Sequence, residues 1–147
     1  MHMSLHNLAA RPVVALLAFA GWAVLLVLAV GASRVADVLA GRKRPNEFTS
    51  GTPHGGDRYW RLNRAHVNSV ENLPIFAAIV LAGAALGVSS LALCRMAEVV
   101  VVARVAQSSF HVASGRSRVV NLRFAAYLTQ VGCFLGMIVE TVRLAVA

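Results

Sequence analysis

Three polar side chains open a long apolar segment, at a spacing that places them on one side of a helix. Arg64, Asn68 and Glu71 are separated by four and then three residues, so at about 3.6 residues per turn they share one face. Such groups are costly to hold at the edge of an apolar segment and are normally kept for a partner, a ligand or a substrate path. Taken alone, the same residues fit equally well a salt bridge within the helix or to a neighbouring helix.

Two later apolar segments carry similar polar stripes at helical spacing. One stripe recurs at i, i+3, i+4 and i+7 and consists of Arg104, Gln107, Ser108 and His111. The other consists of Arg123, Tyr127 and Gln130. We expect the three stripes at the same end of their helices, where they would form one polar cavity near a membrane surface. Arginine favours an anionic ligand there, because its guanidinium binds carboxylates through two parallel hydrogen bonds and stays charged.

The elements that position these stripes follow from composition. Of 147 residues, 58% are hydrophobic and only 14% charged, against about 25% charged in soluble domains. The chain is therefore predicted to be one integral membrane domain of the all-α class. Its apolar runs predict an antiparallel bundle of four membrane-spanning helices, the first of which would start at Pro12, a favourable first helical position. The predicted spans are residues 12–40, 60–86, 89–113 and 120–146.

The net charge of +8 comes almost entirely from arginine, and Lys43 is the single lysine. The arginines flank apolar segments instead of covering a soluble surface, which argues against nucleic acid as a partner. The side of the loops after the first and third spans carries seven cations, against two or three on the other side: Arg42, Lys43, Arg44, Arg58, Arg61, Arg116 and Arg118. The positive-inside rule places these loops in the cytoplasm and both termini outside, in the inner membrane if the cell is bacterial.

No metal site is expected. Cys94 and Cys133 have neither a metal-binding nor a disulfide spacing and are interpreted as small buried side chains. His66 points away from the polar face of its helix, and no histidine follows at i+4. On the third span, Arg95 and Glu98 are expected to pair with each other, since they are three residues apart.

The run Arg64-Ala65-His66-x-Asn68-x-x-Glu71-Asn72-x-x-x-Phe76 resembles the signature of the MAPEG family, the membrane-associated proteins of eicosanoid and glutathione metabolism. Microsomal glutathione transferases carry a nearly identical run. The resemblance extends over essentially the whole chain. It implies a four-helix subunit that assembles as a homotrimer and binds glutathione as a co-substrate between neighbouring subunits, near the cytoplasmic face.

The resemblance also implies roles for individual residues. Glu71 would bind the α-amino group of glutathione, and arginines would bind its carboxylates. Arg123 matches the arginine proposed to stabilise the thiolate, and is the catalytic candidate. The candidate glutathione-binding residues are Arg42, Arg64, Asn68, Glu71, Arg104, Gln107, His111 and Tyr127.

Three positions depart from relatives. His111 replaces a tyrosine, Phe124 stands where the prostaglandin synthase branch has a serine, and Val67 where that branch has a second arginine. These departures argue against a prostaglandin synthase-like isomerase. The expected function is a glutathione-dependent transferase or peroxidase acting on hydrophobic electrophiles from the bilayer. One alternative is a non-catalytic lipid-binding or scaffolding trimer. A four-span transporter is disfavoured, since it predicts polar residues at mid-membrane.

Overall fold

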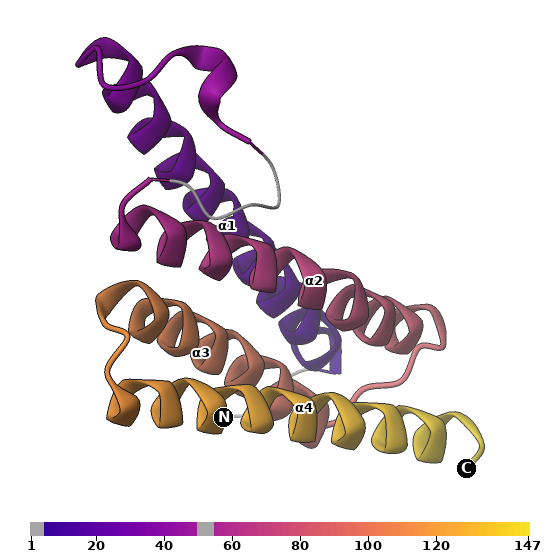
Figure 1. Cartoon of the computed structure of the whole chain (residues 1–147). Coiled ribbons are helices and arrows are strands. Elements are labelled where there is room, and N and C mark those ends of the chain that lie inside the picture. Colours follow the sequence, from indigo (N-terminus) through magenta and orange to yellow (C-terminus); the bar gives the residue numbers. More distant parts are fainter. Residues whose placement is uncertain (1–4, 50–54) are drawn as a thin grey trace.

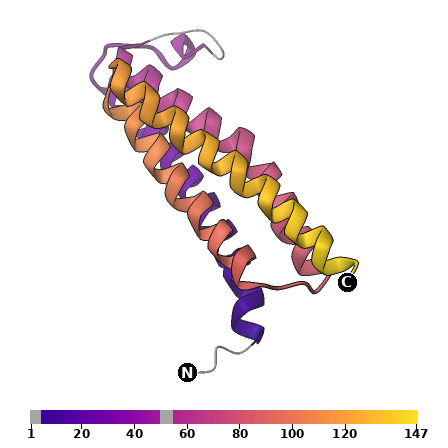
Figure 2. The ribbon, with the colours of Figure 1, turned by 90° about the horizontal axis from the view of Figure 1, so that it is seen from below.

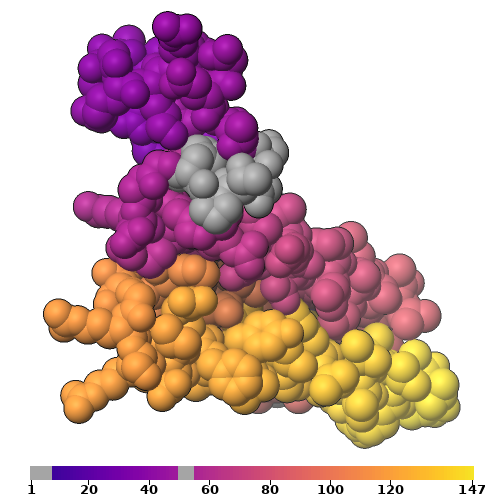
Figure 3. Space-filling view, viewed as in Figure 1, coloured from indigo at the N-terminus to yellow at the C-terminus, as the bar shows by residue number. Residues whose placement is uncertain are grey.

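The computed structural model describes residues 5–49 and 55–147 and consists of long helices that alternate in direction (Figure 1). The prediction of an all-α bundle of four helices is confirmed. The helices α2, α3 and α4 lie side by side, whereas α1 crosses behind α2. The last turns of α1 stand clear of the body of the molecule (Figure 3). The elements are α1 (Leu5–Leu39), the 3₁₀ turn η1 (Pro45–Glu47), α2 (Asp57–Ala85), α3 (Leu91–Ala113) and α4 (Ser117–Ala145).

Three helical segments are long and apolar enough to cross a membrane: Leu8–Leu39, Asp57–Ala85 and Ser117–Ala145. The third predicted span, α3, is not among them, because it carries charged residues and a polar stripe. It has 23 residues, or about 35 Å at 1.5 Å per residue, and short connections join it to α2 and α4. Its polar stripe is buried against the other helices, whereas apolar residues such as Val99 and Val102 lie on its exposed face.

An aromatic cluster from three helices forms the centre of the core. The rings of Phe19 (α1) and Phe76 (α2) have centroids 5.5 Å apart, and Phe134 (α4) lies 5.9 Å from Phe76. All three side chains are buried, and tilted ring pairs at these distances are favourable. α3 packs its small and branched apolar residues, among them Ala97 and Val100, into the same core. Through these contacts the cluster holds α1 against α2 and α4 at the level of Phe19.

The α2–α3 turn is defined by local sequence signals. Gly87 has a positive φ of 66°, the left-handed conformation that glycine adopts without strain after a helix. The amide of Val88 donates to Gly83 O at 3.1 Å, closing the motif. Ser90 then caps α3, because its Oγ accepts from the amide of Leu93 at 3.2 Å. The turn therefore brings α3 back antiparallel to α2.

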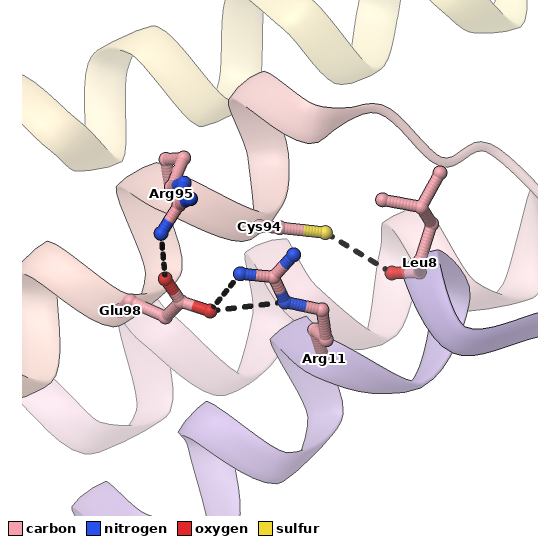
Figure 4. A network of polar contacts seen from close by, with 5 residues as sticks. All are labelled: Leu8, Arg11, Cys94, Arg95 and Glu98. Atoms are coloured by element: carbon pink, nitrogen blue, oxygen red, sulfur yellow. Dashed lines mark hydrogen bonds and ion pairs between the residues drawn. The ribbon is translucent and has the colours of Figure 1, made fainter. Parts of the chain in front are cut away.

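The start of α1 corrects the prediction that the first helix begins at Pro12, since the chain is already helical at Leu5. Proline has no N–H, so the carbonyl of Leu8, four residues earlier, lacks its helical donor. The thiol of Cys94 on α3 donates to that carbonyl at 3.1 Å (Figure 4). A contact with α3 thus compensates for the proline and lets α1 continue through it.

An ion-pair network joins α1 to α3 beside this contact (Figure 4). Arg11 donates from Nε to Glu98 Oε1 at 3.0 Å, and its Nη2 bonds the same oxygen. Arg95 Nη1 lies 3.3 Å from Glu98 Oε2, so the predicted Arg95–Glu98 pair is confirmed. The contact from Arg11 was not predicted, because it joins residues 87 positions apart. Cys94 and Cys133 are free thiols.

Candidate functional site

A buried cation lies in the polar stripe of α3. Arg104 is 1% exposed, and its guanidinium carbon lies 5.4 Å from the centroid of the Phe19 ring. Its Nε and Nη2 have no hydrogen-bond partner among the described residues. A buried charge is costly unless it is paired and hydrogen-bonded. Arg104 thus presents unused donors in the interior of the bundle, which is the property expected of an anion-binding residue.

Amide side chains from α3 and α4 lie in the same part of the bundle. Gln130 Nε2 donates to Gln107 Oε1 at 3.0 Å and also to Ala126 O at 3.1 Å. Both glutamines are buried, and Gln130 Oε1 has no partner in the described part of the chain. This bond holds the Gln107 amide in one orientation next to the turn that carries Arg104.

The polar stripes of three helices meet at one end of the bundle. α2 and α4 begin at this end and α3 ends there (Figure 2). The charges of Arg123 on α4 and of Arg64 and Arg61 on α2 act on His111 on α3. Arg61 Nε also donates to Val112 O at 3.4 Å. The three stripes therefore begin at the same end, as expected, but Glu71 and Gln130 extend them to the middle of α2 and α4.

The polar face of α2 is only partly covered by the rest of the chain. Glu71 is the middle residue of α2, and its negative charge acts on Arg104. Arg64 and Glu71 are exposed, whereas Asn68 is half-buried. Within the described residues neither Arg64 nor Glu71 forms an ion pair. The salt bridge that the sequence left open as an explanation for these two residues is thus not formed in the subunit.

Two candidates on α4 flank the site with different exposure. Arg123 is half-buried, and its Nε is buried without a hydrogen-bond partner among the described residues. Tyr127 is 40% exposed, and Phe124, next to Arg123, is 60% exposed. The cationic group therefore faces inward beside an apolar outer surface.

Arg42 lies apart from the other candidates. It is exposed just after α1 and pairs with Asp37 at 2.8 Å. Nearby, Arg34 Nε donates to Tyr59 Oη at 2.7 Å and ties the end of α1 to the start of α2. The fold of one subunit does not bring Arg42 to the stripes of α2, α3 and α4.

Two residues of the site, Phe19 and Gln130, were not among the candidate glutathione-binding residues. The sequence does not identify Phe19 as a site residue, since it is one apolar residue in a uniformly apolar run. Gln130 did have a signal, because it continues the Arg123–Tyr127 stripe at helical spacing. Only the crossing of α1 over α3 shows that Phe19 packs under Arg104.

The fold and this site define a helical membrane protein with an arginine-rich polar site on three helices. A comparison with protein families gives the MAPEG family over residues 12–143, nearly the whole chain. The chain belongs to the MAPEG family, whose members are associated with glutathione and eicosanoid metabolism. A search of curated proteins found no match.

Proposed function

We propose that this protein is a glutathione-dependent membrane enzyme that conjugates or reduces hydrophobic electrophiles and acts as a homotrimer. The observation that carries the proposal is the buried Arg104 guanidinium, whose Nε and Nη2 have no hydrogen-bond partner in the described chain. A carboxylate would supply both the missing charge and the missing acceptors.

The other groups around Arg104 fit the remaining parts of glutathione, a peptide with two carboxylates and one α-amino group. Arg64 is an exposed cation suited to the second carboxylate. Glu71 is the acidic residue in the polar stripe of α2 that also contains Arg64, and its carboxylate suits the α-amino group of glutathione. Asn68 and Gln107 offer amides for the peptide bonds. The two arginines and the one glutamate thus complement the two carboxylates and the one ammonium group of glutathione.

Glutathione would supply a thiol as the nucleophile. A free thiol has a pKa of about 8.5, so little of it is ionised at neutral pH. The half-buried guanidinium of Arg123, with its unpaired Nε, would favour the thiolate by placing a positive charge next to the sulfur. His111 and Tyr127 would line the cavity beside it. Phe124 and the apolar outer face of α4 would admit a lipophilic substrate from the bilayer.

The exposed charges on α2 support assembly with other subunits. Glu71 lies at the middle of a helix apolar enough to span a membrane. A carboxylate facing lipid at this depth costs about 3 kcal/mol, and a neighbouring subunit that covered it would remove this cost. In a homotrimer the glutathione site would lie between subunits. Arg42, at the projecting end of α1, would then reach the site of a neighbour.

The proposed orientation of the protein in the membrane follows from the basic connections between the helices. The site would lie at the end that carries half of the 14 cations, in the connections and in the first turns of α2 and α4: Arg42, Lys43, Arg44, Arg58, Arg61, Arg116 and Arg118. With these loops in the cytoplasm, by the positive-inside rule, glutathione would enter from the cytoplasm and both termini would lie outside. In a bacterial cell the membrane would be the inner membrane.

The departures at His111 and Phe124 favour a second candidate, a non-catalytic lipid-binding or scaffolding trimer that keeps the glutathione site. A measurement of enzymatic activity distinguishes the enzyme from the non-catalytic trimer. The test measures conjugation of glutathione to a generic aryl halide, and reduction of a lipid hydroperoxide, by the protein purified in detergent. Binding of glutathione without either activity would establish the scaffold.

Arg123→Ala is the informative variant, and Arg118→Ala is its control, since Arg118 is an exposed arginine on the first turns of the same helix. Removing Arg123 should lower turnover by about 100-fold, the usual effect of losing a group that stabilises a developing anion. Chemical crosslinking should still give a trimer. Unchanged turnover in Arg123→Ala would show that this residue does not activate the thiol.

A further inference from the structure

A separate pocket opens between α1, α2 and α3 near the basic loops, and none of the candidate glutathione-binding residues lines it. This open pocket has a volume of about 400 Å³, within the range of about 300–1,000 Å³ for small-molecule sites. Each helix contributes an apolar and a polar part to the wall. The residues that matter here are Trp22, Leu26, Arg58, Leu62, Ser108 and Ala113.

Two polar groups of this wall are buried without partners. Ser108 is 2% exposed, and neither its Oγ nor the indole Nε1 of Trp22 has a hydrogen-bond partner among the described residues. Buried polar groups nearly always have one, and each exception calls for an explanation. Both residues line the same pocket, so a ligand whose oxygen atoms reached these two buried donors would satisfy them together.

The mouth of the pocket carries a positive charge. Arg58 is exposed in the first turn of α2 and forms no ion pair within the described part of the chain. The start of a helix adds a partial positive charge from its free N–H groups, which Asp57 in the same turn partly offsets. The loops at this end add Lys43 and Arg116, and the first turn of α4 adds Arg118. The charge at this end complements an anionic group.

The inner wall of the pocket is apolar. Leu26 is buried and Leu62 half-buried, and both belong to helices apolar enough to lie in a membrane. A soluble anion would make no use of this surface, whereas a lipid would place its phosphate at the charged mouth and an acyl chain along the leucines. Juxtamembrane arginines are known to attract anionic headgroups.

We propose that this pocket binds an anionic phospholipid of the leaflet at the basic-loop end. Arg58 binds the phosphate. Trp22 Nε1 and Ser108 Oγ donate to oxygens of the headgroup or of the first ester, and one acyl chain runs over Leu26 and Leu62. None of the candidate glutathione-binding residues lines this pocket, although Ser108 belongs to the same stripe of α3 as Arg104. Its occupation holds α1 against α2 and α3 where α1 begins to diverge from them.

The test measures lipid binding to the purified protein in nanodiscs and by native mass spectrometry, with phosphatidylglycerol, phosphatidylcholine and soluble glycerol 3-phosphate as probes. Arg58→Gln removes the phosphate contact, and Arg118→Gln removes an equal charge from the same end of the molecule outside the pocket. Ala113→Leu fills the pocket from its exposed rim. Ala92→Leu makes the same change at an exposed position at the other end of α3.

We expect phosphatidylglycerol to bind at least tenfold more tightly than phosphatidylcholine. Arg58→Gln should lose at least tenfold of this affinity, since a charge-assisted hydrogen bond is removed. Ala113→Leu should lose as much, whereas Arg118→Gln and Ala92→Leu should change it by less than about fivefold. Three results would each overturn the proposal: equal losses in Arg58→Gln and Arg118→Gln, full competition by glycerol 3-phosphate, or equal binding of phosphatidylcholine.

Discussion

The guanidinium of Arg104 on α3 stacks over the ring of Phe19 on α1, with 5.4 Å between the guanidinium carbon and the ring centroid. The ring offers a favourable cation–π contact but no hydrogen-bond acceptor and no negative charge. The contact therefore holds Arg104 in place while leaving its Nε and Nη2 unused in the described chain. The contact thus leaves a buried cation with unused donors, which the proposed anion-binding role requires.

The first prediction concerns a conflict between stability and binding at Arg104. Arg104→Met removes a buried charge with little change in volume, so the thermal midpoint of the ligand-free protein in detergent should be unchanged or higher. The gain in the free energy of unfolding should be up to about 3 kcal/mol. Glutathione should raise the midpoint of the wild type but not that of the variant. Arg95→Met, at an exposed position, is the control and should still respond to glutathione.

A lower midpoint for Arg104→Met without ligand would contradict this reading, because it would mean that the cation stabilises the empty bundle. A variant that keeps the full response to glutathione would show that Arg104 is not a ligand-binding residue.

The second prediction concerns the α1–α3 ion pair. Arg11 and Glu98 are partly buried, with side-chain exposures of 26% and 39%, whereas Arg95 is 67% exposed. Glu98→Gln should therefore lower the free energy of unfolding by about 1–2 kcal/mol, and Arg95→Gln by about 0.5 kcal/mol or less. Thermal unfolding in detergent measures both. Equal effects would indicate that the contact from Arg11 adds nothing to the exposed pair.

The third prediction concerns the thiol that compensates for Pro12. In Pro12→Ala the carbonyl of Leu8 regains a helical N–H donor. The hydrogen bond from Cys94 Sγ to this carbonyl is then no longer needed to satisfy it. Cys94→Ala should then destabilise the wild type more than it destabilises Pro12→Ala. The difference should be about 0.5–1 kcal/mol, in the range of coupled neighbouring sites. Additive effects in this double-mutant cycle would reject the proposed link.

Much of this fold could be predicted from local patterns. Long apolar runs define α1, α2 and α4, and the glycine and serines after Leu86 define the α2–α3 turn, because the causes lie within a few residues of each other. The Arg95–Glu98 pair could be predicted for the same reason. The start of α1 could not, since continuation through Pro12 depends on a thiol 86 positions away along the chain.

The candidate site likewise has one part that could be predicted from the sequence and one part that could not. The spacing of Arg104, Gln107 and His111 indicates one face of a helix, and the structure buries that face. The spacing of Arg64 and Glu71 also indicates one face, but sequence cannot tell whether the same chain covers it. In the structure these two remain exposed, because burial depends on how whole helices pack and on any neighbouring subunit.

The most direct measurement of the central claim is calorimetric titration of glutathione into the purified protein, the wild type beside Arg64→Gln, Glu71→Gln and Arg116→Gln. Arg64 and Arg116 are both exposed arginines at the basic end, but only Arg64 belongs to the proposed site. We predict saturable binding by the wild type, a loss of at least tenfold in Arg64→Gln and Glu71→Gln, and a change below about threefold in Arg116→Gln. No binding by the wild type, or equal affinity in all four proteins, would contradict the account.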